Sequence, residues 1–129
     1  ADPFDDLRNM GLAYLDFAER NPLKYRLMFG STLPDAEAHP RMMERGRHAF
    51  SILERAIEQV HHHLGREPDR NSVELDSMFV WSTVHGMASL RQSEPQRRLE
   101  LSHRTSAEMI AHALSAVGRG LGQMSRLTA

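Results

Sequence analysis

Residues 77–90, SMFVWSTVHGMASL, carry no formal charge and are apolar on nearly every side of a helix. Side chains three and four residues apart share a helix face. One face therefore holds Met78, Trp81, His85 and Ala88, and the roughly opposite face holds Phe79, Thr83, Gly86 and Leu90. A helix that is apolar all round must be covered on most of its sides. We expect this helix to pack against its neighbours and also to border a binding site, with Gly86 where another backbone comes close.

Composition indicates one globular domain. The chain has 129 residues, of which 40% are hydrophobic and 26% charged, and this is ordinary for a single folded domain. No run reaches the roughly 18 apolar residues of a membrane helix, and the N-terminus lacks the pattern of a signal peptide. Because cysteine is absent, disulfides and thiolate metal sites are excluded, and we expect a cytoplasmic protein. A net charge of −1 without a basic face argues against nucleic-acid binding by this chain alone.

The periodicity is helical throughout, without the period-two alternation of strands. Asp2 and Pro3 are expected to begin a first helix, which Asn21–Pro22 should end. A short segment, LKYRLMF, follows, and residues 30–40, GSTLPDAEAHP, read as a loop.

A second long helix is expected from about residue 40 to residue 64, ended by Gly65. Asn71, with Glu74 three residues on, resembles a capping box that starts the helix of residues 77–90. Pro95 breaks that helix. The last helix carries Gly118, Gly120 and Gly122, which should loosen its end because glycine costs about 1 kcal/mol per helical position. The sequence thus predicts an all-α bundle of about five helices, spanning 1–129 as a single domain.

The imidazole of His85 has two readings. It lies one turn beyond Trp81 in an apolar wall, and small-molecule pockets are mostly apolar and aromatic with a few placed polar groups. A buried histidine is equally well explained as a core residue whose hydrogen bonds are satisfied. Spacing alone leaves both open.

Two stretches resemble a known family. GLAYLDFAERNPLKYRLMFG (11–30), followed at a distance by WSTVHGMASL (81–90), is similar to the C-terminal domain of TetR-family transcriptional regulators. The similarity is to the variant named for a Trp–His–Gly signature, here Trp81, His85 and Gly86. It implies a cytoplasmic bacterial regulator in which this domain binds a small hydrophobic effector and forms a homodimer. A separate N-terminal helix-turn-helix domain would read operator DNA, and we expect that domain to be absent from these residues.

The resemblance also implies site residues. Ligand-binding candidates lie on four helical segments and are Tyr14, Phe17, Met28, Phe29, Phe50, Leu53, Met78, Trp81 and His85. The late helices are expected to pair with those of a second copy as a four-helix bundle, because small side chains let helix axes approach closely. Interface candidates are Gly86, Leu90, Met109, Ala113, Ala116 and Gly120, the last four on a stripe beside the Ile110–Leu114–Val117–Leu121 stripe.

Two Glu-x-x-His motifs and a run of histidines are the features that a metal site could use. Glu58-x-x-His61 and Glu100-x-x-His103 have the spacing of di-iron ligands, but Glu58 lies about 140° from Leu53 on the helical wheel, so these residues read as solvated charges. Three successive histidines, His61 to His63, cannot converge on one ion. We therefore predict no metal, no cofactor and no enzymatic activity. A helical di-iron-type metalloprotein and a stand-alone helical interaction module remain the alternatives.

Overall fold

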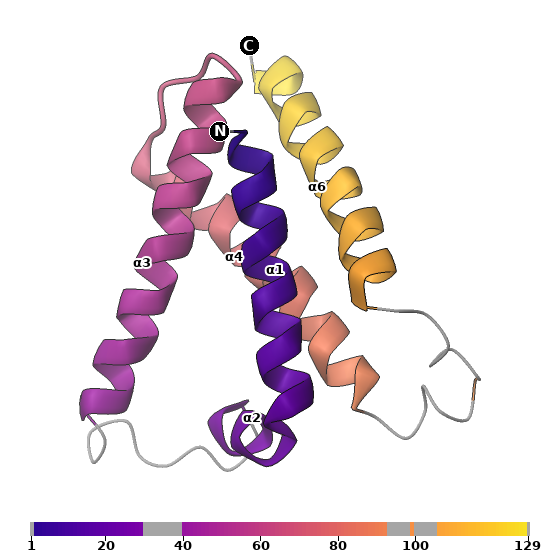
Figure 1. The fold of residues 1–129 in the computed structure, drawn as a ribbon. Coiled ribbons are helices and arrows are strands. Elements are labelled where there is room, and N and C mark those ends of the chain that lie inside the picture. The colour runs from indigo at the N-terminus through magenta and orange to yellow at the C-terminus, as the bar shows by residue number, and fades with distance from the viewer. Residues whose placement is uncertain (1, 30–39, 93–98, 100–105, 129) are drawn as a thin grey trace.

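The protein is all-α. A computed structural model describes residues 2–29, 40–92, 99 and 106–128, without the side chains of residues 27, 29, 42, 106 and 122–128. Its helices are α1 (Pro3–Arg20), α2 (Pro22–Phe29), α3 (Pro40–His63), α4 (Arg70–Arg91) and α6 (Ser106–Thr128). Helix α1 lies between α3 and α6, α4 crosses behind it, and α2 folds beneath its C-terminal end (Figure 1). The predicted all-helical class is confirmed.

Local signals in the sequence fix most helix ends. The Asp2 carboxylate accepts a hydrogen bond from the backbone N–H of Phe4 at 2.9 Å, and Pro3 occupies the first helical position. Helix α1 ends before Asn21, whose backbone N–H still donates to the Phe17 carbonyl. Gly65 follows α3 with a φ of 76°, the left-handed conformation that glycine adopts without steric cost.

One expectation about a helix end was wrong. Helix α4 is capped by Asp69 and not by Asn71: the Asp69 carboxylate accepts from the backbone N–H of Ser72 at 3.0 Å, and hydrogen bonds from this end of the helix lower the pKa of Asp69. The last helix runs through its glycines to Thr128. Burying one large aliphatic side chain contributes about 1.5–3 kcal/mol, and this offsets the cost of a helical glycine.

The hydrophobic core consists of two clusters. One, here called the terminal cluster, lies at the end of the bundle that holds the N- and C-termini (Figure 1). Its buried members are Leu7, Ile57, Val60, Val73, Val80, Val117 and Leu121. The other, the corner cluster, lies beside the turn between α1 and α2, and its buried members are Leu15, Ala18, Tyr25, Val84, Ala88 and Ile110. Helices α1, α4 and α6 contribute to both clusters, whereas α3 contributes only to the terminal cluster.

A buried polar contact joins α3 to α4 near the terminal cluster. The Nε2 atom of His61 lies 2.7 Å from a carboxylate oxygen of Asp76, and His61 is 1% exposed. Its neighbours His62 and His63 are exposed. Successive side chains on a helix point in different directions, so the triple histidine acts as one structural residue and two surface residues.

Glycine allows α1 and α6 to approach closely. A Cβ atom built on Gly11 would lie 3.1 Å from Cδ1 of Ile110, and one on Gly118 would lie 3.3 Å from the Phe4 ring. Ordinary carbon contacts begin near 3.5 Å. These two positions therefore set how near the helix axes can come.

Replacing Gly11 with leucine should destabilise the fold. The new side chain would overlap Ile110, and overpacking a core costs about 1–3 kcal/mol. Urea unfolding followed by circular dichroism measures the change. Gly46→Ala is the control, because a Cβ there meets nothing within 4 Å; it should be neutral or stabilising by up to about 1 kcal/mol. Equal stability of the two variants would contradict the close approach.

Candidate functional site

Helix α4 presents three apolar faces with different surroundings. One face is buried in both core clusters and consists of Val73, Ser77, Val80, Val84 and Ala88. A second holds Trp81 and His85, which are half-buried, and Met78, which is 42% exposed. The third is uncovered, with Leu75 61%, Phe79 50% and Leu90 58% exposed. The expectation that this helix packs internally is confirmed for the first face, and the other two hold the candidate sites.

The second face carries a polar network around His85. The Tyr25 hydroxyl lies 2.5 Å and the Tyr14 hydroxyl 3.1 Å from Nδ1 of His85, and the two hydroxyl oxygens are 3.2 Å apart. The Trp81 side chain also forms a hydrogen bond with the Tyr14 hydroxyl. Residues from α1, α2 and α4 are thus joined at one point.

Donor chemistry gives this network a direction. An indole N–H can only donate, so Trp81 donates to the Tyr14 oxygen. The Tyr14 hydroxyl can then donate to Tyr25 or to Nδ1 of His85, and the Tyr25 hydroxyl can donate to Nδ1 or to the His85 carbonyl 3.4 Å away. Burial, followed by the Tyr25 hydrogen bond, raises the pKa of Tyr14, so the phenol stays neutral. His85 is a satisfied histidine that also lies in the wall of the candidate site.

Aromatic contacts extend the network to α3. The Phe50 and Trp81 ring centroids are 6.2 Å apart, as are those of Trp81 and His85. The Tyr14 and Tyr25 rings meet edge to face at 5.8 Å. Such separations are within the favourable range for aromatic pairs. The structure therefore brings together four of the predicted ligand-binding residues: Tyr14, Phe50, Trp81 and His85.

The other predicted ligand-binding residues lie elsewhere. Phe17 is 39% and Met28 41% exposed, so these side chains, like Met78, present apolar surface to solvent. Leu53 packs against the terminal cluster instead. The side chain of Phe29 lies outside the described residues. Leu53 is therefore better explained as a core residue, and the exposed side chains are apolar surface that a ligand can cover.

The first half of α3 leaves its inner face uncovered. Every described side chain from residue 40 to residue 49 is exposed. Met43 is 36% exposed, and a Cβ added to Gly46 would meet nothing within 4 Å. At about 100° per residue, Met43, Gly46 and Phe50 continue the face that buries Ile57. In Figure 1, α3 diverges from α1 toward the end where α2 lies. The inner face of this half thus has room beside it.

Tyr25 is the functional residue that sequence reasoning missed. It is 3% exposed, and its hydroxyl makes the shortest contact to His85. The available signal was its residue type: a tyrosine buried in a short helix needs a partner for its hydroxyl. No pattern in the sequence pairs it with a histidine 60 residues away.

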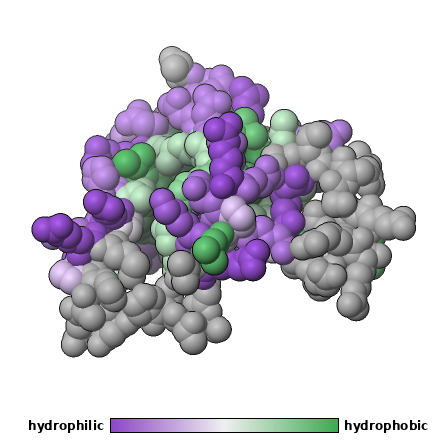
Figure 2. Space-filling view, turned by 60° about the horizontal axis from the view of Figure 1, so that its bottom comes forward, coloured by the Kyte–Doolittle hydropathy of each residue, from purple (hydrophilic) through white to green (hydrophobic). Residues whose placement is uncertain are grey.

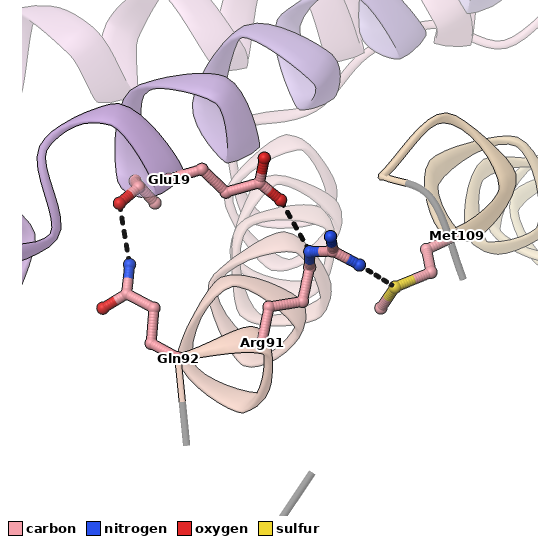
Figure 3. A network of polar contacts seen from close by, with 5 residues as sticks. Glu19, Arg91, Gln92 and Met109 are labelled. Atoms are coloured by element: carbon pink, nitrogen blue, oxygen red, sulfur yellow. Dashed lines mark hydrogen bonds and ion pairs between the residues drawn. The ribbon is translucent and has the colours of Figure 1, made fainter. Parts of the chain in front are cut away.

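A second polar cluster ties α1, α4 and α6 beyond the network (Figure 3). The Arg91 guanidinium donates to the Glu19 carboxylate at 2.6 Å and to the Met109 sulfur at 3.2 Å. The Gln92 amide donates to the Ala18 carbonyl at 2.8 Å. These contacts hold the C-terminal end of α4 against the end of α1 and the start of α6.

The predicted interface residues lie on one side of α4 and α6. Leu90 and Ala116 are exposed, whereas Gly86, Met109, Ala113 and Gly120 are half-buried. A Cβ on Gly86 or Gly120 would meet nothing within 4 Å. The expectation that another backbone comes close at Gly86 was therefore wrong for the described part of the chain. An open groove of about 420 Å³, lined by Met87, Glu108, Met109, His112 and Ala113, runs between the two helices. This side therefore has unfilled apolar surface.

Metal binding finds no support in the part of the chain that the structure describes. No three histidine, aspartate or glutamate side chains there lie close enough to share an ion. Glu100 and His103 of the second predicted motif lie outside the described residues. Within the described helices, none is both long and apolar enough to cross a membrane.

The described residues form an all-helical body with a small polar network on one face of α4. Residues 7–114 match the family described as tetracyclin repressor-like, C-terminal domain. The chain therefore belongs to this family of transcriptional-regulator domains. No curated protein and no solved structure matches it significantly. The Trp–His–Gly subtype stays a prediction from residues 81–86.

Removing the Tyr25 hydroxyl should cost stability. Tyr25→Phe removes the closest hydrogen-bond partner of Nδ1 of His85, and leaving a buried polar atom poorly satisfied costs about 1–3 kcal/mol. Urea unfolding measures the loss. Thr83→Val is the control, because the Thr83 hydroxyl bonds only the Phe79 carbonyl within α4 and is exposed; it should change stability by less than about 0.5 kcal/mol. A Tyr25→Phe protein as stable as the parent would contradict the network.

Proposed function

We propose that this domain binds a small apolar effector between the first half of α3 and the Trp81–His85 face of α4, and dimerises through α4 and α6. As in the regulators that it resembles, effector binding would change operator affinity through a separate helix-turn-helix domain. On this proposal the protein is a regulator and not an enzyme. The observation that supports this proposal best is the division of α4 into three faces. One face is buried in the core, the Trp81–His85 face borders uncovered apolar surface, and the Leu75–Phe79–Leu90 face is itself uncovered.

The effector site is supported by the surroundings of the His85 network. Ligand pockets combine apolar and aromatic walls with a few oriented polar groups. Here Phe50 and Trp81 supply rings, and the exposed Phe17 and Met28 supply further apolar surface. The phenols and the imidazole supply the polar groups. An effector that covers these side chains gains roughly 25 cal/mol per Å² of apolar surface removed from water.

Dimerisation is supported by the uncovered face of α4 and the small-residue stripe of α6. Leu75, Phe79 and Leu90 are each at least half exposed, and contiguous apolar surface of this kind marks interaction sites. The open space at Gly86 and Gly120 would admit the helices of a second copy closely. A twofold axis lets the same patch meet itself.

Filling the space beside Gly46 should block the effector site. Gly46→Phe adds a ring on the inner face of α3, where an added Cβ meets nothing within 4 Å. The neutral apolar dye N-phenyl-1-naphthylamine is a suitable probe, because it absorbs the emission of Trp81, the one tryptophan of the chain. The parent should bind it saturably with loss of Trp81 fluorescence. The variant should bind it at least fivefold more weakly, because roughly 1 kcal/mol of apolar contact is lost.

The matched control is His48→Phe, which adds the same ring to an exposed position on the other side of α3. It should leave dye affinity unchanged. Equal dye affinity of Gly46→Phe and the parent would show that the site is elsewhere, and dye binding without any change in Trp81 fluorescence would argue against the α4 wall.

A charge in the proposed seam should weaken the dimer. Ala116→Glu places a carboxylate in apolar surface, and a buried unpaired charge costs several kcal/mol, so the dimer should dissociate at least tenfold more readily. Ala111→Glu is the control, since Ala111 is exposed on the opposite side of α6. Sedimentation velocity over a concentration series measures the dimer dissociation constant of the parent and of both variants. A monomeric parent, or equal effects of the two substitutions, would contradict the seam.

A further inference from the structure

Charge is distributed unevenly along the chain. Residues 22–49 hold five lysines and arginines against three acids, a net charge of +2, whereas the whole chain carries −1. In the described part of this stretch the only acid is Glu44, because Asp35 and Glu37 lie in the link that the structure does not describe. The five bases are all exposed and are Lys24, Arg26, Arg41, Arg45 and Arg47.

None of these five bases has a carboxylate partner among the described residues, unlike three arginines of α1 and α4. Arg8, Arg20 and Arg91 each lie within 2.9 Å of a carboxylate oxygen. No ion pair within the described residues involves any of the five bases of α2 and α3. Their positive charge is therefore not neutralised by the described part of the fold and is available to an anion.

Three of the five bases border the proposed effector site. On α3, at about 100° per residue, Arg47 lies about 60° from Phe50, beside the Met43–Gly46–Phe50 face, whereas Arg45 lies about 140° from Phe50 and off that face. On α2, Lys24 and Arg26 are exposed on either side of Tyr25, whose hydroxyl contacts His85. Both segments lie at the same end of the molecule (Figure 1). Figure 2 turns this end toward the viewer and shows isolated hydrophobic patches surrounded by hydrophilic surface.

The interior of the proposed site, in contrast to its basic rim, carries uncharged groups. The groups on the α4 wall are an indole, an imidazole and two phenols, and the Tyr14 phenol is kept neutral by its raised pKa. A charged group placed among them would lose its hydration without gaining a counter-ion. An anion is therefore favoured at the rim, and an apolar group inside.

From this arrangement we propose that the effector is an anionic amphiphile: an apolar chain or ring system with one carboxylate, sulfate or phosphate group. The apolar part covers the inner face of α3 and the Trp81 wall, and the anionic group lies among the bases of α2 and α3. This inference rests on the proposed effector site and adds the chemical class of its ligand.

Three probes with twelve-carbon chains test the head group: dodecanoate, 1-dodecanol and dodecyltrimethylammonium. Each is titrated below its critical micelle concentration, with Trp81 fluorescence and calorimetry as readouts. Dodecanoate should bind about tenfold more tightly than dodecanol, as expected from two partly screened contacts to surface cations, and the cation should bind most weakly. Raising the salt concentration from 50 to 500 mM should weaken the binding of dodecanoate and leave the binding of dodecanol unchanged.

Charge-removing variants test which arginines are responsible for the preference for dodecanoate. Arg26→Gln combined with Arg47→Gln should weaken dodecanoate binding fivefold to tenfold and leave dodecanol binding unchanged. The matched control combines Arg55→Gln with Arg70→Gln, which removes the same charge from exposed positions: Arg55 on the side of α3 away from the core and Arg70 at the start of α4. This control should preserve the preference for dodecanoate.

The outcomes separate the inference from the function on which it rests. Equal affinity for dodecanoate and dodecanol, both with a Trp81 response, would overturn the anionic class and leave the effector site standing. Tightest binding of the cation would do the same. Dodecanoate binding that leaves Trp81 fluorescence unchanged would mean surface attachment and would overturn the inference. Failure of all three probes would overturn it as well, while the neutral dye independently tests the site.

Discussion

The imidazole of His85 can lie on an otherwise apolar helix because two phenols reach its Nδ1 atom. An unsatisfied ring nitrogen in this wall would cost about 1–3 kcal/mol, a large fraction of the stability of a small domain. Tyr14 comes from α1 and Tyr25 from α2, so the same contacts that satisfy the ring also fix the corner between these helices against α4. The corner cluster forms around this point, and Tyr25 belongs to both.

This anchoring leaves α3 in a different situation from the other long helices. Helices α1, α4 and α6 are held in both core clusters, and α3 only in the terminal cluster. The contact between His61 and Asp76 strengthens that attachment. Toward its start, α3 meets the α4 wall through Phe50 and Trp81. The unfilled inner face around Gly46 follows from this one-ended attachment, since nothing in the corner cluster extends far enough to cover it.

Sequence reasoning succeeded where spacing along one helix carries the information. The opposition of the Trp81–His85 side of α4 to the Phe79–Leu90 side, the apolar stripe of α6 and the cap at Asp2 follow from positions a few residues apart, and the structure reproduces them. The separate buried face, which includes Ala88, was not predicted. It failed where two local signals competed, as at Asp69 and Asn71, both of which are good cap residues. It also could not pair Tyr25 with His85, because helix periodicity does not determine which distant helices meet. The divergence of α3 depends on the volume of side chains packed at its far end, a quantity that no single stretch of sequence contains.

If the domain binds an effector as proposed, the unequal anchoring decides which helix would respond to it. Ligand shifts a conformational equilibrium only by binding one arrangement better than another. Moving α4 would break the His85 network at one point and the contacts of Arg91 and Gln92 at another, whereas pivoting α3 about the terminal cluster would bring Met43, Gly46 and Phe50 toward a ligand without breaking either. Closure of α3 is therefore the lower-energy response. Its pivot adjoins the start of α4, so the motion would reach the uncovered Leu75–Phe79 face through His61 and Asp76, and effector binding and helix pairing would be coupled there.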